Sequence, residues 1–190
     1  MDEQKFIESQ CDEIASCFFS LKTLAPSIYV VAKLWANALL HHKKILFCGN
    51  GGSAADAQHL AAELSGRYEM NRGAMAGLAL TTDTSAITAI ANDFGYETIF
   101  SRQLEAIGQA GDILYAISTS GNSTNVLRAA EKARSMGITV IAVTGRNAGK
   151  LALLADIVLN VPATRTCHVQ EMHIGIGHML CSLVERALNA

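Results

Sequence analysis

The sequence has no excess of charge of either sign. Its 190 residues include 15 Lys and Arg and 17 Asp and Glu, which gives a formal net charge of -2 at pH 7. Proteins that bind nucleic acid through its phosphates usually carry a clustered basic surplus. We therefore expect this chain to have no nucleic-acid partner.

The sequence also has no Cys-x-x-Cys pair, although it contains five cysteines. An odd number of scattered cysteines is typical of reduced thiols in a cytosolic protein, and not of a disulfide framework. These cysteines are Cys11, Cys17, Cys48, Cys167 and Cys181.

We also expect no secretory signal. Residues 2–5 are polar and have no apolar core behind them. The longest apolar runs are interrupted by Lys33 or by threonines, well short of the length that spans a bilayer. We expect a cytoplasmic protein without a membrane partner.

No linker or low-complexity segment divides the chain, and half of its residues are hydrophobic, which predicts one domain with a substantial core. Apolar residues from Ile7 to Leu21 recur at spacings of three and four, and a second helical stretch follows Pro26. We expect a helical hairpin over residues 1–42. Its apolar stripe can serve assembly or cover the protein's own sheet, and the spacing fits both.

From residue 43 to residue 190, short apolar runs alternate with helical stretches. Runs that are apolar on both faces and alternate with helices predict a parallel sheet between two helix layers. The fold class is therefore α/β, a flavodoxin-like or Rossmann-like three-layer sandwich with five strands. The predicted strands are 45–48, 77–80, 113–117, 139–143 and 157–161.

Two loops rich in glycine and serine follow the first and third predicted strands. They read Gly-Asn-Gly-Gly-Ser at 49–53 and Ser-Thr-Ser-Gly-Asn-Ser at 118–123, and each opens a helical stretch. Small residues let the backbone approach a ligand, and the free N–H groups at a helix start favour an anion. We call these two loops the phosphate cradle, and they predict a sugar phosphate ligand.

The first loop also fits the Gly-x-Gly-x-x-Ala pattern of dinucleotide-binding units. Such a unit needs an acidic residue at the end of its second strand, about 20 residues on, to hold the ribose. The nearest candidate, Asp83, lies too far along the chain. A dinucleotide also leaves the second hydroxyl-rich loop unexplained.

Four side chains that can move protons or hold a metal lie near these loops. His59 and Glu63 are four residues apart in the helix that follows the first loop, so they share one face. Gln170 and His178 are eight residues apart in the last helix, about 12 Å along its axis. One metal can bind both only if their side chains converge or if different subunits supply the ligands. An exposed imidazole and carboxylate pair is the alternative for His59 and Glu63.

Several long motifs together resemble the phosphoheptose isomerases of the sugar isomerase (SIS) superfamily. The resemblance covers nearly the whole chain and includes the helical stretches at its start. The motifs lie at residues 49–59 with Glu63, 91–95, 101–103, 117–123 and 169–173.

The resemblance implies an aldose–ketose isomerase. Members interconvert sedoheptulose 7-phosphate and D-glycero-D-manno-heptose 7-phosphate through an enediol, the first step toward activated heptose for bacterial surface polysaccharide. It also implies a homotetramer with one zinc ion per subunit. Glu63 and His178 match the catalytic pair. The zinc ligands match His59, Glu63, Gln170 and His178. Substrate contacts match Asn50, Gly51, Gly52, Ser53, Glu63, Asn92, Asp93, Ser118, Thr119, Ser120, Ser123 and Gln170.

The chain departs from the usual family sequence at one position. His168 stands where the family usually has an arginine, and histidine is a weaker anion contact.

One alternative function is a non-catalytic SIS tetramer that binds the replication initiator. Members of that branch lack the side chains that match Glu63 and His178. The other is an isomerase of a different phosphosugar.

Overall fold

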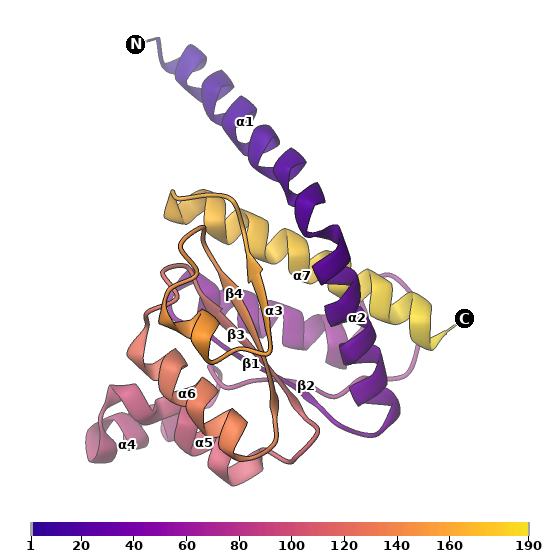
Figure 1. Ribbon diagram of the computed structural model, residues 1–190, viewed down its shortest axis with the longest axis vertical. Coiled ribbons are helices and arrows are strands. Elements are labelled where there is room, and N and C mark those ends of the chain that lie inside the picture. Colours follow the sequence, from indigo (N-terminus) through magenta and orange to yellow (C-terminus); the bar gives the residue numbers. More distant parts are fainter. Residues whose placement is uncertain (1, 190) are drawn as a thin grey trace.

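A sheet of five parallel strands forms the centre of the computed structural model, which describes residues 2–189 (Figure 1). The strand order is β2-β1-β3-β4-β5. The strands are β1 Ile45–Cys48, β2 Gly77–Ala79, β3 Ile113–Ser118, β4 Thr139–Thr144 and β5 Ile157–Asn160. The predicted five-stranded parallel sheet is confirmed, and each predicted strand end lies within one residue of the observed one.

Helices cover both faces of the sheet, so the predicted three-layer sandwich is also confirmed. One face is covered by α2 (Ala25–Leu40), α3 (Gly52–Ser65) and α7 (Thr166–Leu188), and the other by α5 (Ile99–Ile107) and α6 (Thr124–Ser135). The helix α4 (Thr84–Phe94) packs outside α5. The remaining helical turns are η1 (Leu21–Leu24), η2 (Tyr96–Thr98) and η3 (Lys150–Leu153).

Each strand in the middle of the sheet is buried on both faces, as a covered parallel sheet requires. Between α2 and the sheet, the only tryptophan of the chain, Trp35 of α2, makes edge contacts with Phe47 and Tyr115. All three side chains are fully buried. Under α5 and α6, Leu46 and Leu114 face the second half of the core. The five cysteines are all unpaired.

The start of the chain does not form the predicted hairpin. The helix α1 (Glu3–Ser20) continues through η1 into α2 without turning back, and it leaves the body of the molecule (Figure 1). The backbone stays helical because Leu21–Leu24 form a 3-10 turn and Pro26 lies in the first turn of α2, where its missing N–H costs no hydrogen bond. Met1, the first residue of the predicted segment 1–42, and Ala190, the last residue of the predicted segment 43–190, lie outside the described residues.

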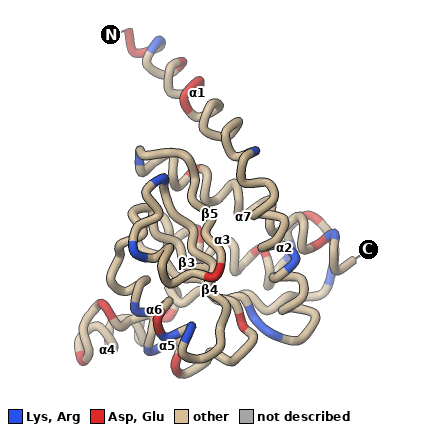
Figure 2. The backbone as a smooth tube through the Cα atoms, viewed as in Figure 1, with Lys and Arg blue, Asp and Glu red and all other residues tan. Residues whose placement is uncertain are grey.

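The two N-terminal helices differ in what they cover. Val31, Ala32 and Trp35 of α2 are buried in the core, and this helix packs along α7. None of the residues of α1 is buried, and the exposed fraction of Phe19 reaches 69%. Together α1 and α2 form a helix that is long and apolar enough to cross a membrane by length and composition alone. Figure 2 shows acidic and basic residues along α1, whereas α2 carries a single charged residue, Lys33.

The strand order places a ligand crevice between β1 and β3. These two strands are neighbours in register, with Cys48 beside Ala116, yet they lie apart in sequence. From β1 the chain continues to β2 on one side of this pair, and from β3 it continues to β4 on the other side. Open α/β sheets bind ligands where the strand order reverses in this way, outside the carboxyl ends of the strands. Both loops of the phosphate cradle begin at this edge.

Candidate active site

The first cradle loop turns sharply from β1 into α3. Gly51 has φ 55, the left-handed conformation that glycine adopts without strain, and it caps the N-terminus of α3. A side chain at Gly49 would lie within 3 Å of the backbone of Ser53, so the loop folds tightly on itself. Ser53 is buried there, at a helix start suited to an anion.

The second cradle loop makes a similar turn from β3 into α6. The hydroxyls of Ser118 and Ser123 lie 3.1 Å apart, and the N–H of Asn122 donates to the hydroxyl of Ser120 at 3.2 Å. Gly121 has φ 64 and lies against the carbonyl of Ala148, which leaves no room for a side chain. Beside Thr119 and Ser120 opens a cleft of about 300 Å³ that Arg146 also lines.

A pair of asparagine amides joins the two cradle loops. Asn50 donates to Asn125 at 2.9 Å, and Asn125 donates back to Asn50 at 2.8 Å. The hydroxyl of Tyr96 also donates to Asn50, at 3.0 Å. Asn125 is 97% buried, so this contact holds the two loops at a fixed separation. A cleft of about 490 Å³ lies beside it, lined in part by Ser123 and Arg128.

The sequence reasoning names Asn50 but misses both of its partners. Asn125 lies two residues after the end of the serine loop and begins the buried face of α6, so a polar residue at that place could have been noticed. Tyr96 lies just beyond the 91–95 motif. Neither position carries a signal that would pair it with Asn50, because the pairing depends on β1 and β3 being neighbours.

The structure brings together His59, Glu63 and His178, which we call the proton-transfer cluster. The Nε2 atoms of His59 and His178 lie 2.9 Å apart, and His59 Nε2 lies 3.3 Å from Glu63 Oε1. The predicted shared face of His59 and Glu63 on α3 is therefore present. His178 reaches them from α7.

A glycine allows α7 to approach α3 closely enough for this contact. A side chain at Gly177 would lie 2.5 Å from a methyl of Leu60, so only glycine fits between the two helices at their present separation. Gly177 precedes His178 directly and Leu60 follows His59 directly. The close packing therefore lies beside the pair of imidazoles.

Gln170 takes a different place from the other predicted zinc ligands. A side chain at Gly52 would lie 2.8 Å from the carboxamide carbon of Gln170, so this carboxamide lies against the first cradle loop. The last helix thus runs from the cradle, at Gln170, to the proton-transfer cluster, at His178. The donor types fit zinc, which binds imidazole nitrogens and carboxylate oxygens. Among residues 2–189, no group of three or more His, Cys, Asp or Glu side chains forms a ready metal centre.

Asn92 and Asp93 lie at the end of α4, outside the sandwich. Both are exposed, and the amide of Asn92 donates to Asp93 at 2.8 Å. Within the described chain, the structure gives them no hydrogen bond to the cradle or to the proton-transfer cluster. Their predicted contact with substrate remains a prediction.

Two further titratable groups lie close to the site. Burial raises the pKa of Asp56, on α3, to about 6, although the charge of His59 opposes this shift. Asp56 is not among the predicted site residues, although an acidic residue within an alanine-rich helix could have drawn attention to it. Burial lowers the pKa of His173 to about 4, so this histidine is neutral and packs in the core.

His168, which replaces the usual arginine, is buried and contacts α1. Its Nδ1 lies 2.9 Å from Glu171 Oε2, and its Nε2 lies 3.4 Å from Glu13 Oε1. The hydrogen bond with Glu171, followed by that with Glu13, raises the pKa of His168. This side chain links α7 to α1 and does not enter the cradle.

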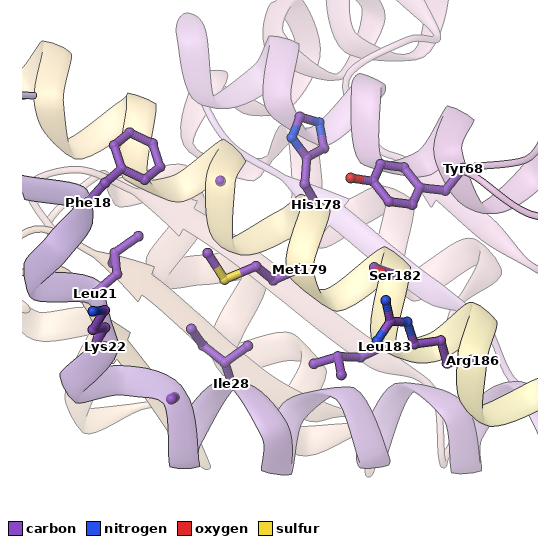
Figure 3. A pocket seen from close by; sticks show the side chains of 12 residues that line it. Phe18, Leu21, Lys22, Ile28, Tyr68, His178, Met179, Ser182, Leu183 and Arg186 are labelled. Carbon is purple, nitrogen blue, oxygen red and sulfur yellow. The ribbon is translucent and has the colours of Figure 1, made fainter. Parts of the chain in front are cut away.

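An apolar cavity of about 730 Å³ lies next to the proton-transfer cluster (Figure 3). Phe18, Ile28 and Met179 line it, and His178 and Tyr68 lie at its rim. The ring of Tyr68 is stacked on the imidazole of His178, with centroids 5.6 Å apart and 25° between the planes. The cavity lies where α1 leaves the body of the molecule.

Comparison with known proteins gives consistent matches. The SIS domain family matches residues 11–145. A phosphoheptose isomerase of Akkermansia muciniphila is 52% identical over 184 residues, 97% of each chain, and one of Rhodospirillum rubrum is 53% identical over 182 residues, 96% of this chain and 97% of its own. Among solved structures, a phosphoheptose isomerase from Neisseria gonorrhoeae has a TM-score of 0.91 at 44% identity and covers 96% of this chain and 98% of its own. One from Francisella tularensis has a TM-score of 0.94 at 36% identity, over 98% and 100%.

Replacement of Asn50 by aspartate tests whether the amide pair belongs to an anion site. Asn50→Asp keeps the acceptor for Tyr96 and Asn125 but adds a negative charge at the cradle, so the affinity for inorganic phosphate should fall about tenfold or more. Titration calorimetry measures this affinity. Asn71→Asp, an exposed change of the same charge, is the matched control and should bind phosphate normally. Equal affinity of the two variants would remove Asn50 from the anion site.

Proposed function

The chain belongs to the SIS domain family and, within it, to the phosphoheptose isomerases, and from this premise we propose which of its residues perform the isomerisation. It is an aldose–ketose isomerase acting on sedoheptulose 7-phosphate. We propose that the product is D-glycero-D-manno-heptose 7-phosphate, formed through an enediol. The observation that carries the residue assignment is that α3 begins at the phosphate cradle and holds His59 and Glu63 farther along, beside His178.

The phosphate of the sugar binds the cradle in this proposal. The N-termini of α3 and α6 point their free N–H groups at one crevice, and the hydroxyls there add hydrogen bonds. The residues proposed for this contact are Asn50, Gly51, Gly52, Ser53, Ser118, Thr119, Ser120 and Ser123. Held at that end, the sugar extends toward Glu63 and His178 in this proposal. Gln170 lies against the first loop and is placed to bind a sugar hydroxyl.

Glu63 and His178 move protons at the other end of the sugar. Glu63 lies ten residues beyond Ser53, about 15 Å along α3, and is only partly exposed. We assign to Glu63 the removal of a proton from the carbon next to the carbonyl and its return to the neighbouring carbon. His178 exchanges the proton of the carbonyl and hydroxyl oxygens. His59, between them, fixes the positions of both side chains.

We propose one zinc ion per subunit, held by His59, Glu63 and His178. Gln170 lies against the first cradle loop and would be a fourth ligand only if its side chain turned toward these three or if another subunit supplied it. When bound, zinc supplies a Lewis acid that polarises the substrate carbonyl. A carboxylate that binds zinc tightly is less available as a base, so the two assignments of Glu63 compete. The Nε2 atoms of His59 and His178 lie within hydrogen-bond distance of each other.

The two alternative functions are not favoured. A non-catalytic SIS tetramer loses the side chains that match Glu63 and His178, whereas this chain has both and brings them together through His59. An isomerase of another phosphosugar shares the same cradle, but the relatives that are 52% and 53% identical over nearly the whole chain are phosphoheptose isomerases. Asn92 and Asp93 are proposed to contact the sugar beyond the cradle.

We further propose a cytoplasmic homotetramer that serves the synthesis of activated heptose for bacterial surface polysaccharide. The exposed apolar side chains of α1, Phe6, Ile7, Phe18 and Phe19, support an interface between copies of this chain. The apolar cavity between α1, α2 and α7 continues this surface up to His178. A neighbouring subunit seated there would close the site.

Turnover of sedoheptulose 7-phosphate tests the reaction and the substrate together. The protein should convert this ketose phosphate to an aldose phosphate, observed by NMR as a new anomeric proton signal. In ²H₂O, deuterium should enter carbon 2, because an enediol exchanges the transferred proton with solvent.

Glu63→Gln is the control for this experiment. The amide keeps the size of the side chain but cannot accept the proton, so turnover should fall at least about 10³-fold while binding of the sugar phosphate is largely kept. Substantial residual isomerisation in Glu63→Gln would remove Glu63 from the role of base.

Removal of metal separates a required zinc ion from a tolerated one. Protein treated with chelator and dialysed should lose its isomerase activity and regain it with one equivalent of zinc per subunit, as counted by elemental analysis. His59→Ala should bind zinc at least about tenfold more weakly, because it removes one ligand. Full activity of protein shown to be free of metal would instead support proton transfer by Glu63 and His178 alone.

The mass in solution tests the assembly. Light scattering should give four times the 20.2 kDa of one chain. Introduction of charge into the exposed apolar face, as in a Phe6→Glu, Phe19→Glu double variant, should lower this mass, whereas Glu8→Gln on the same helix should leave it unchanged. A wild-type mass equal to that of one chain contradicts the tetramer.

A further inference from the structure

A buried ion pair joins the last turns of α7 to the loop that follows α3. Glu185 of α7 and Arg72, in the loop that joins α3 to β2, have side chains only 2% exposed and lie 2.8 Å apart. A buried pair is stable only when hydrogen bonds satisfy its remaining atoms. Neither residue has a part in the proposed proton transfer.

The carboxylate of Glu185 binds the loop backbone at three successive residues. The N–H groups of Tyr68, Glu69 and Met70 donate to its two oxygens at 2.8 to 2.9 Å. Burial alone would raise the pKa of Glu185, but these backbone hydrogen bonds and Arg72 hold it below its ordinary value. The carboxylate is therefore charged at neutral pH, and it fixes this part of the loop in one conformation.

Arg72 ties the same loop to the end of α3. Its guanidinium donates to the carbonyl oxygens of Glu63 at 2.7 Å and Leu64 at 2.9 Å. A cation at the C-terminus of a helix satisfies free carbonyl groups and interacts favourably with the helix dipole. The Glu185–Arg72 pair thus holds the backbone of Glu63 on one side and that of Tyr68 on the other.

Tyr68 is the side chain that this loop presents to the proton-transfer cluster. Its ring is stacked on the imidazole of His178, and His59 approaches the same imidazole edge-on, with centroids 5.1 Å apart. Figure 3 shows Tyr68 and His178 side by side at the rim of the cavity. Within the described residues, the hydroxyl of Tyr68 forms no hydrogen bond, and the one hydrogen bond of the His178 side chain is to His59. The orientation of His178 therefore depends on these two ring contacts.

We propose that Tyr68 is a positioning residue for His178, and that the Glu185–Arg72 pair holds Tyr68 in place. This inference rests on the proposed role of His178 in the isomerisation. Proton transfer requires the imidazole within hydrogen-bond reach of the sugar oxygens, and a rotated ring loses that geometry. The aromatic face of Tyr68, and not its hydroxyl, supplies the contact.

Two variants of Tyr68 separate the ring from the hydroxyl. Tyr68→Phe keeps the stack and should isomerise within about twofold of the wild-type kcat. Tyr68→Leu removes it and should lower kcat about tenfold with KM little changed, the factor expected for the loss of one aromatic pair. The matched control is Tyr29→Leu, an exposed tyrosine of α2, which should keep its activity. Melting temperature and solution mass are recorded for each variant.

A double-variant cycle tests the role of Glu185. Glu185→Gln should lower kcat in the wild-type background but cause no further loss in Tyr68→Leu, because its effect passes through Tyr68. Equal losses in both backgrounds would show that Glu185 acts independently of Tyr68 and would overturn its role in holding that ring. A wild-type kcat in Tyr68→Leu would overturn the positioning role of the ring. If Tyr68→Phe falls as far as Tyr68→Leu, the hydroxyl and not the stack is responsible. Failure of the proposed function is distinct from these outcomes, since it shows as an inactive wild type or an active Glu63→Gln.

Discussion

The hydrogen-bonded pairing of β1 with β3 is the constraint on which the site depends. These strands lie side by side in register although 64 residues separate Cys48 from the start of β3. Their carboxyl ends meet at one edge of the sheet, and the two glycine and serine loops follow from there. The amide pair of Asn50 and Asn125 then fixes the separation of the loops. Without this strand pairing, two anion-binding helix starts would lie in different parts of the molecule.

A second constraint is the close packing of α7 on α3. In the proposed function the cradle holds one end of the substrate and the chemistry occurs at the other, so the distance between the two ends must be spanned rigidly. Both helices run from the cradle to the proton-transfer cluster, with Gln170 and His178 on one and Ser53 and Glu63 on the other. Gly177 allows the helices to approach each other at Leu60, where the imidazoles meet. The geometry of the reacting groups therefore rests on regular secondary structure, which is stiffer than a loop.

The sequence predicts local features well and contacts between distant segments poorly. The strands and the two cradle loops follow from apolar runs and glycine, which act over a few residues. The hairpin prediction was wrong because Pro26 was interpreted as a break, whereas proline in a first helical turn is compatible with a nearly continuous helix. The meeting of His178 with His59, and the partners of Asn50, depend on packing and strand order, so residue spacing alone left them open. The resemblance to a family supplied the roles of these residues that spacing did not.

The burial of Trp35 has a consequence for how this molecule can be followed in solution. The chain has one tryptophan, wholly enclosed between α2 and the sheet and in edge contact with Phe47 and Tyr115. Indole emission depends on the polarity around the ring, so the intrinsic fluorescence of the protein reports from a single point in the core. That point lies between α2 and the sheet, and a change in the signal therefore registers loss of the packing that encloses the ring.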